Sequence, residues 1–311
     1  MKIAIASGKV GTGKTTVATN LALAAARRGL RVTYLDCDVE EPNGHLFLKP
    51  RITTSRSAIR LHPRVQESLC THCGQCGSIC QFSAIVCVGQ KVLVYPELCH
   101  ACGGCALVCP ADAITEVEQP IGAIETGMAH AGADKAGAAL SIRFVQGSLR
   151  IGEAMSTPLI RQLKEENPGN QNHDGPDLAI FDCPPGASCP VIESVRGANL
   201  VLLVTEPTPF GLNDLRLAVE TLQAVGLPMA VVINRIGEGE EEQETRAFCG
   251  SRGIPVWAGI PDERRVAEAY ARGELAFDEA PAFHQAIEVI LNRLGQTGLN
   301  ASLPLSEATS R

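Results

Sequence analysis

Short apolar runs alternate with amphipathic stretches along most of the chain, and the two kinds of segment predict different elements. The apolar runs lack a clean alternation of apolar and polar residues, which is typical of strands covered on both faces. The stretches between them have helical spacing. Strands are expected at 2–7, 31–36, 177–182, 199–205, 229–233 and 255–260, and helices at 14–28, 212–225 and 262–273. This alternation predicts an α/β fold with a doubly wound, mostly parallel sheet.

A segment with its own internal repeat interrupts the alternation between about residues 60 and 120. CTHCGQCGSICQFSAI (70–85) is echoed by CHACGGCALVCPADAI (99–114). The sequence between the two cysteine runs, AIVCVGQKVLVYP, predicts a small hairpin. We therefore expect a small α+β domain inserted between strands of a larger one.

The expected boundaries follow from these patterns. The Ala- and Gly-rich residues 122–140 are expected to form a flexible return, and the polar tail after about 295 is expected to be disordered. The predicted domains are a discontinuous P-loop domain (1–60 and 119–295), the insert (61–118) and the tail (296–311).

Composition narrows the kinds of protein that fit. The chain has 311 residues and 45% hydrophobic content, enough for one large core or two smaller ones. A net charge of −7 and a pI near 5.6 argue against a broad basic surface for nucleic acid. No run of about 18 apolar residues predicts a membrane span, and the first residues predict a buried strand rather than a signal peptide. We expect a cytoplasmic protein that neither binds nucleic acid nor inserts into a membrane.

A phosphate-binding motif lies between the first predicted strand and helix. Residues 8–15, GKVGTGKT, match G-x-x-x-x-G-K-[ST] in the context that this motif requires, against the alternative of a chance glycine-rich turn. Lys14 is expected to reach the β- and γ-phosphates, and the Thr15 hydroxyl to bind Mg²⁺. Lys9 would repel Lys14 unless an anion lay nearby, and its alternative is a solvated loop lysine. The candidate nucleotide-binding residues of this segment are Gly8, Lys9, Gly11, Thr12, Gly13, Lys14, Thr15 and Thr16.

Acidic residues follow two of the predicted strands. DLAIFDCPPG ends a strand at Asp182, where a P-loop fold holds Mg²⁺ through water, and Gly186 offers a backbone N–H to a γ-phosphate. The alternative for Asp182 is a turn or helix-capping acid. YLDCDVEEPN places Asp38 just beyond another strand, as a candidate for orienting the attacking water. Asp36 or Glu40 could fill that role instead.

Eight of the thirteen cysteines form two runs with the spacing C-x₂-C-x₂-C-x₃-C. This spacing holds [4Fe–4S] clusters, and in two-cluster ferredoxins the last cysteine of each run belongs to the other cluster. Zinc is the weaker alternative, because the two four-cysteine runs are complete and in tandem. His72 and His100 are expected to be exposed and not to be ligands, and the remaining cysteines (Cys37, Cys87, Cys183, Cys189 and Cys249) to be small buried side chains. The expected ligand sets are Cys70, Cys73, Cys76 and Cys109 for one cluster and Cys99, Cys102, Cys105 and Cys80 for the other.

Taken together, these motifs resemble the MinD/ParA/Mrp group of deviant Walker-A ATPases. The resemblance rests on the two loop lysines, Asp38, DCPPG (182–186), VTEPTPFGLNDL (204–215) and VINR (232–235), and it covers residues 1 to about 293. With the cysteine insert, the chain resembles the branch that contains an inserted ferredoxin domain. One residue departs from the family pattern: Val10 stands where glycine is usual, and its branched side chain could restrict the loop.

The resemblance implies a role for each matching residue. Lys9 would reach the nucleotide of a partner subunit across an ATP sandwich dimer, either a homodimer or a heterodimer with a similar ATPase. Asp38 would activate water and Asp182 would hold Mg²⁺ through water. Asn234 would read adenine, helped by Pro261 and Asp262. The implied catalytic residues are Lys9, Lys14 and Asp38, and the implied cofactors are ATP, Mg²⁺ and two [4Fe–4S] clusters.

Three functions fit these features. In the first, which the sequence favours, ATP binding and hydrolysis gate electron transfer from the cluster module to a redox partner. In the second, the protein assembles or carries iron–sulfur clusters in an ATP-dependent way. In the third, it is a MinD/ParA-like positioning protein whose clusters are structural or sense redox state. Eight cysteines in ferredoxin order favour permanent clusters over carriage, and the C-terminal tail has no apolar face for a membrane.

Overall fold

The computed structural model describes residues 1–133, 139–167, 175–237 and 241–297, and the chain divides into two compact units. Unit 1 comprises Met1–Ser55, Ile124–Ser148 and Ile160–Arg311. Unit 2 comprises Arg56–Ala123 and Leu149–Leu159. The second unit is therefore an insertion that also takes in a short segment much later in the chain.

A nine-stranded sheet forms the framework of unit 1, in the order β11-β10-β9-β1-β8-β2-β7-β6-β3. The strand pairs from β11 through β7 are parallel, which confirms the mostly parallel α/β sheet. The central strands are fully buried because their residues are apolar on both faces, as in LAIFD of β8. The strands are β1 (Lys2–Ala6), β2 (Val32–Asp36), β3 (Arg51–Val65), β6 (Ile114–Ala133), β7 (Ala139–Leu149), β8 (Leu178–Asp182), β9 (Leu200–Thr205), β10 (Met229–Ile236) and β11 (Val256–Pro261).

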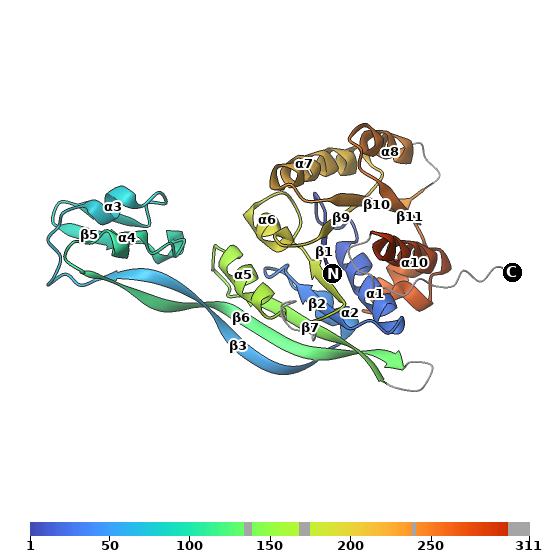
Figure 1. Ribbon diagram of the computed structural model, residues 1–311, viewed down its shortest axis with the longest axis horizontal. Coiled ribbons are helices and arrows are strands. Elements are labelled where there is room, and N and C mark those ends of the chain that lie inside the picture. The colour runs from blue at the N-terminus through green and yellow to red at the C-terminus, as the bar shows by residue number, and fades with distance from the viewer. Residues whose placement is uncertain (134–138, 168–174, 238–240, 298–311) are drawn as a thin grey trace. The chain divides into compact units, whose positions relative to one another are not determined.

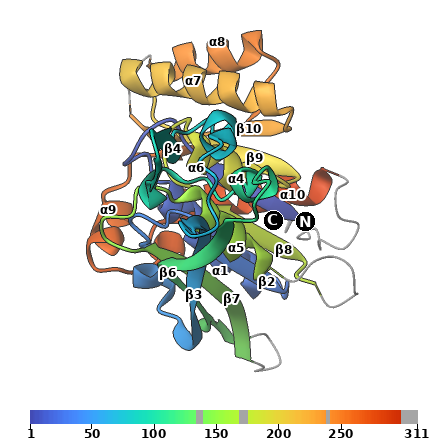
Figure 2. The ribbon, with the colours of Figure 1, turned by 90° about the vertical axis from the view of Figure 1, so that its left-hand side faces the viewer.

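Helices cover both faces of this sheet, as Figures 1 and 2 show. Helices α1 and α10 lie on one face, and α6, α7 and α8 lie on the other. The helices of unit 1 are α1 (Lys14–Arg27), α2 (Gly44–Leu48), α6 (Cys189–Val195), α7 (Pro209–Val225), α8 (Glu241–Ser251), α9 (Arg264–Ala271) and α10 (Pro281–Gln296), with a 3₁₀ turn at Ala276–Asp278. Helix α5 (Thr157–Glu165) begins in unit 2 and ends in unit 1.

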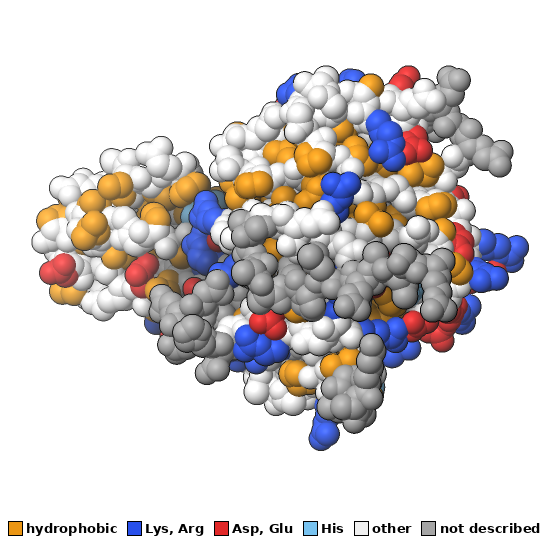
Figure 3. All heavy atoms as spheres, turned by 45° about the vertical axis from the view of Figure 1, so that its right-hand side comes forward, with side chains coloured by type: hydrophobic (Ala, Val, Ile, Leu, Met, Phe, Trp, Pro, Cys, Tyr) orange, Lys and Arg blue, Asp and Glu red, His pale blue; other side chains and the backbone are white. Residues whose placement is uncertain are grey.

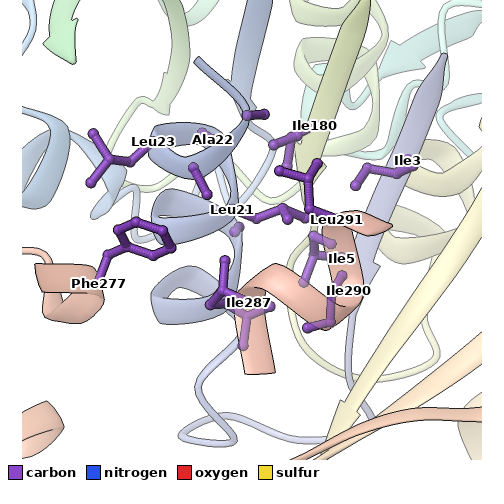
Figure 4. Close-up of a cluster of buried hydrophobic side chains, with 14 of the residues drawn as sticks. Ile3, Ile5, Leu21, Ala22, Leu23, Ile180, Phe277, Ile287, Ile290 and Leu291 are labelled. Atoms are coloured by element: carbon purple, nitrogen blue, oxygen red, sulfur yellow. The ribbon is translucent and has the colours of Figure 1, made fainter. Parts of the chain in front are cut away.

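The main hydrophobic core lies between the sheet and the helices α1 and α10 (Figure 4). Ile3 and Ile5 of β1 pack with Ile180 of β8 on this face because alternate strand residues share a face. Helix α1 contributes Leu21 and neighbouring alanines, and α10 contributes the apolar side of its amphipathic sequence. This packing fixes the carboxyl ends of β1, β2 and β8, from which the loops described below emerge.

Unit 2 contains two short helices and a hairpin. Helices α3 (Gln75–Ile79) and α4 (Gly104–Leu107) start at equivalent positions of the two repeats, and β4 (Ile85–Val88) pairs antiparallel with β5 (Lys91–Val94). The predicted hairpin is therefore confirmed. A 3₁₀ turn at Pro96–Leu98 precedes the second cysteine run. The buried cluster near the cysteines is small, consisting of Cys76, Ile85 and Ile114 with half-buried neighbours.

Some sequence expectations need correction. The predicted flexible return at 122–140 is wrong where the structure describes it, because residues up to Ala133 continue β6 and Ala139 begins β7. Of the predicted tail, Gln296 ends α10, and residues 298–311 lie outside the described residues. The scattered cysteines are not all buried either, since Cys87 is half-buried and Cys189 is exposed.

The surface and the helices also bear on the class of protein. Lys and Arg side chains are interspersed with Asp and Glu on the face of the molecule in Figure 3. Within the described ranges, no helix combines the length and apolar character needed to cross a membrane.

Candidate functional site

The loop between β1 and α1 has the shape that its glycines allow. Gly11 (φ 79°) and Gly13 (φ 92°) both adopt the left-handed conformation that disfavours other residues. A Cβ on Gly13 would lie 2.4 Å from Nδ2 of Asn234, and a Cβ on Gly8 would lie 2.2 Å from the carbonyl oxygen of Asp214 in α7. The motif glycines are thus needed both for the turn and for close packing against β10 and α7.

A pocket with about 1290 Å³ of space free of protein atoms opens beside this loop. Lys14, Thr15 and Asp38 line it near the start of α1, and Asn234 lies on another wall, where its Nδ2 donates to the carbonyl oxygen of Thr12 at 2.8 Å. The other predicted residues that line it are Gly11, Gly13, Thr16, Pro261 and Asp262. Pro185, Arg235 and Glu263, which belong to the quoted or expected motifs, also line the pocket, as do Glu41, Asn43 and Tyr270, for which no role was predicted.

Sheet register brings two acidic side chains together at the carboxyl ends of β2 and β8, and neither lines the pocket. Asp36 of β2 pairs with Asp182 of β8, and both are buried. Tyr34 Oη donates to Oδ2 of Asp182 at 2.7 Å, and the nearby Thr15 hydroxyl helps to lower the pKa of this carboxyl. Burial raises the pKa of Asp182, whereas these hydrogen bonds and the Lys14 charge oppose the rise. Oδ1 of Asp182 is buried and has no hydrogen-bond partner among the described residues, so it can accept a cation-bound water.

The two acids after β2 have different environments. Oδ2 of Asp36 accepts the backbone N–H groups of Asn43 and Gly44, and Oδ1 accepts that of Asp38. Asp36 therefore holds the loop, and it does not line the pocket, nor does Glu40. Burial raises the pKa of Asp38 to about 6, Lys14 opposes this rise and Asp182 adds to it. A carboxyl group with a raised pKa in a pocket is typical of functional sites.

Other predicted residues lie outside the pocket in this conformation. Nζ of Lys9 forms an ion pair with Oε2 of Glu206 at 2.9 Å, and Arg235 pairs with Oε1 of the same carboxylate at 2.5 Å. Glu206 is mostly buried, with 12% of its side chain exposed. The N–H of Gly186 donates to the carbonyl oxygen of Ser7 at 2.9 Å, so it is not free to bind a phosphate here.

In unit 2, the two cysteine runs adopt the same unusual backbone. His72 and Ala101 at equivalent positions both have left-handed φ angles, 55° and 52°, and so do Ser83 and Asp112, 53° and 47°. Such angles cost energy in residues other than glycine and persist where the surroundings require them. The sequence repeat is therefore also a repeat of backbone shape, wrapped around the cysteine side chains.

Each repeat contributes cysteines to two pockets. We name the first thiol pocket by Cys70, Cys73, Cys76 and Cys109, and the second thiol pocket by Cys99, Cys102, Cys105 and Cys80. They contain about 340 and 400 Å³ of space free of protein atoms. His72 lines the first and His100 the second, and both are exposed, as expected from the sequence. The last cysteine of each run thus lines the pocket of the other run.

The thiols differ in their surroundings. Burial, followed by the neighbouring Cys87 thiol, raises the pKa of Cys76 to about 12. Burial also raises the pKa of Cys80, but backbone N–H groups from Phe82 onward outweigh it and the net shift is downward. Backbone N–H groups donate to the sulfurs of Cys99 and Cys109 as well. Hydrogen bonds to sulfur stabilise thiolates, the form that binds metal.

A buried ion pair supports the second thiol pocket and was missed from sequence. Arg60 of β3 is fully buried and pairs with Glu153 at 3.3 Å. Nη1 of Arg60 also donates to the carbonyl oxygen of Cys99 at 3.3 Å. Because Glu153 lies far along the chain, no local pattern could have linked it to the cysteine insert.

Comparison with known proteins identifies the nucleotide-binding framework. A model of the CobQ/CobB/MinD/ParA nucleotide-binding domain matches residues 3–276. The chain belongs to this family. An uncharacterised protein of Methanocaldococcus jannaschii is 33% identical over 237 residues, which cover 76% of this chain and 79% of the relative. The family membership shows a MinD/ParA-like nucleotide-binding protein.

Solved structures of the MinD/ParA group share its fold. The septum site-determining protein MinD of Pyrococcus horikoshii, complexed with Mg-ADP, aligns with a TM-score of 0.58 at 18% identity and covers 96% of both chains. A shorter match is 58% identical over 41 residues to an iron–sulfur cluster carrier protein of Pseudomonas fragi, covering 13% of this chain and 14% of that one.

Proposed function

We propose that this chain is a Mg²⁺-dependent ATPase whose nucleotide state controls a module of two [4Fe–4S] clusters and gates electron transfer to a redox protein partner. The observation that carries the proposal is the presence of two four-cysteine pockets on the same chain as a MinD/ParA-type nucleotide pocket. Each part has a chemistry that the other lacks.

The thiol pockets fit clusters better than single ions. Four cysteines surround each space, and within the described residues no three His, Cys, Asp or Glu side chains are grouped to hold one metal ion. A larger body bridging the four sulfurs suits this spacing, and cysteine thiolates are the usual ligands of [4Fe–4S] clusters. Cys109 and Cys80 would join the two repeats through the clusters, which suits a unit with so small a buried core. When bound, such clusters store and pass single electrons.

The nucleotide pocket supplies the residues that hydrolysis requires. The backbone N–H groups of the β1–α1 loop and Lys14 would hold the phosphates, and Thr15 with Asp182 Oδ1 would hold Mg²⁺, directly and through water. Asp38 lines the pocket and would orient the attacking water. Asn234, which braces the loop at Thr12, would contact the base together with Pro261 and Asp262.

The ion pair between Lys9 and Glu206 would link the nucleotide state to dimerisation. In its pair with Glu206, the Lys9 ammonium is kept within its own chain. To reach the nucleotide of a partner subunit, it would have to leave Glu206. Formation of an ATP-bound dimer, with a second copy or a similar ATPase, would therefore exchange this ion pair for contacts across the interface.

The chain path offers a covalent route from the nucleotide pocket to unit 2. Asp36 holds the start of α2 through Asn43 and Gly44, and β3 begins shortly after α2 and continues into unit 2. A change in the loop that carries Asp38 would therefore act on residues joined directly to β3. This continuity supports nucleotide control of the cluster module.

The test is anaerobic purification of the full chain, with iron, sulfide and zinc analysis and electron paramagnetic resonance after reduction. We expect iron and sulfide in equal amounts, a reducible low-potential signal, and Mg²⁺-dependent ATPase activity that Lys14→Ala abolishes. Zinc in the thiol pockets, or no reducible signal, would overturn the redox part. Unchanged ATP binding by Lys14→Ala would overturn the nucleotide part.

A second candidate function is ATP-dependent cluster carriage, which the short match to an iron–sulfur cluster carrier protein favours. Carriage requires labile clusters, whereas Cys76 and Cys99 are buried. Incubation with an apo-acceptor separates the two functions. Cluster loss to the acceptor only with ATP present would support carriage, and retention of both clusters would support electron transfer.

A further inference from the structure

Beyond the ligand cysteines, the two repeats differ at one equivalent position that lies against each pocket. The offset between the repeats carries Cys70 onto Cys99, and the same offset carries Cys87 onto Glu116. Cys87 lies on β4 beside the first thiol pocket, and Glu116 on β6 lines the second. A neutral thiol and a carboxylate thus occupy matching places.

The Cys87 thiol contacts a ligand of the first thiol pocket. Its Sγ lies 3.6 Å from Sγ of Cys76, a residue with only 8% exposure. Once Cys76 binds iron it has no proton, so Cys87 must be the donor of the S–H···S hydrogen bond. Gly77 leaves room for this contact, because a Cβ there would lie 3.4 Å from the Cys87 sulfur.

Glu116 brings a negative charge to the second thiol pocket. Its carboxylate oxygens lie about 4 Å from where a Cβ on Gly103 would stand, in the loop between Cys102 and Cys105. Arg60, which contacts the carbonyl oxygen of Cys99 in this pocket, forms a buried ion pair with Glu153, and Glu153 also pairs with Arg150 at 3.9 Å. Glu116 is exposed, so solvent screens part of its charge, but its side chain lines the pocket directly.

We infer that Cys87 and Glu116 set the reduction potentials of the two clusters apart, with the first thiol pocket at the higher potential. Reduction adds one electron and increases the negative charge on the cluster sulfurs. A hydrogen-bond donor at sulfur stabilises that charge and raises the potential, whereas a nearby carboxylate lowers it. The first electron to enter the module would then reduce mainly the cluster held in the first thiol pocket. Neither residue would bind iron: Cys87 would act through its hydrogen bond to the Cys76 sulfur, and Glu116 through its charge.

This inference rests on the proposed two-cluster module, and a redox titration of the anaerobic full chain tests it. Dithionite supplies the electrons, mediators set the potential, and electron paramagnetic resonance follows each one-electron step. In the wild type we expect two separate steps. Cys87→Ala should lower the potential of the upper step, the reduction assigned to the first thiol pocket. The expected shift is at least threefold in the equilibrium constant, which is about 28 mV at 59 mV per tenfold. Glu116→Gln should raise the potential of the lower step, the reduction assigned to the second thiol pocket, by at least twofold in the equilibrium constant, about 18 mV.

Control variants separate hydrogen bonding and charge from packing. Cys87→Ser keeps a donor and should retain the wild-type upper step, which a packing role alone would not restore. Cys249→Ala removes a buried cysteine of unit 1, and Glu118→Gln removes an exposed charge two residues from Glu116. Neither variant should change the potential of either step.

Each other outcome overturns the inference. Unchanged steps in Cys87→Ala with full iron content would overturn the role of Cys87 and leave the proposed function standing. Loss of iron in Cys87→Ala would make Cys87 a ligand instead. A wild-type protein without clusters would overturn the proposed function together with the inference.

Discussion

Replacing Asp38 by asparagine should stabilise the protein while it abolishes ATP hydrolysis. Burial raises the pKa of Asp38 to about 6, from 3.8, the ordinary value of an aspartate in an unfolded chain. The folded state therefore holds this proton more tightly than the unfolded state, and ionisation at neutral pH costs folding free energy. Asparagine has nearly the same shape and cannot ionise, so it removes that cost along with the carboxylate that would orient water.

The size and sign of the effect follow from the two pKa values. Well below pH 3.8 the carboxyl is protonated in both states and carries no penalty. The penalty then grows as pH rises through the folded pKa, reaching about 1.6 kcal/mol at pH 5 and about 3 kcal/mol at pH 7.5. The stability of Asp38→Asn should therefore exceed that of the wild type by a margin that widens by about 1.4 kcal/mol between these pH values.

Urea unfolding at a series of pH values measures this margin. The single tryptophan, Trp257, is buried in β11 and reports on unit 1 through its fluorescence. Glu40→Gln serves as the control because Glu40 is an exposed carboxylate in the same loop, and its margin should stay flat. A margin for Asp38→Asn that stays constant, or that narrows as pH rises, would refute the reasoning. A second readout is ATPase activity, expected to fall by about 10² or more while ATP binding persists.

Three further predictions concern other contacts. Glu206→Gln should free Lys9 and raise ATP-dependent dimerisation and hydrolysis by about two- to fivefold, corresponding to an ion pair of about 1 kcal/mol. Analytical ultracentrifugation and ATPase rates check this, and unchanged values would show that the pair does not restrain Lys9. Cys109→Ala should remove the cluster of the first thiol pocket, and the electron paramagnetic resonance signal of the second cluster should remain. Loss of only the second cluster's signal would contradict the exchange of cysteines between repeats. Arg60→Met leaves the buried Glu153 with only the longer pair to Arg150, at 3.9 Å, and should destabilise unit 2 by up to about 3 kcal/mol. Earlier loss of iron during heating checks this, with the exposed Arg64→Met as control.

The sequence predicted the parts of the fold that carry a local signal. The central strands were recognisable because nearly all of their residues are buried and most are apolar, and the β1–α1 loop because its glycines have few other uses. β3 and β6 were missed because most of their residues are exposed or only half-buried, so neither strand shows an apolar period. The Ala- and Gly-rich part of β6 looked flexible, although strand pairing, not side-chain pattern, defines it.

The same distinction applies to the candidate sites. The cysteine spacing pointed to the two pockets because the first three cysteines of each run fold locally around one pocket, and the fourth follows a known pattern of exchange. The partners of Lys9 and Arg60 come from distant segments, and no spacing rule links Lys9 to Glu206 or Arg60 to Glu153. Tertiary contacts of this kind decide which charges are free, and they become visible only in three dimensions.

The exchange of cysteines between the repeats also has a consequence for biosynthesis. A nascent chain that ends before Cys99 contains only three thiols of the first thiol pocket and one of the second, so neither set is complete. Both sets are complete once Cys109 has been made, and unit 2 is complete at Leu159. Pro185, Asn234 and Tyr270 of the nucleotide pocket are synthesised later still. During translation, all eight cysteines that would receive iron and sulfide are therefore present before the nucleotide pocket is complete, and first loading of the clusters need not wait for ATP.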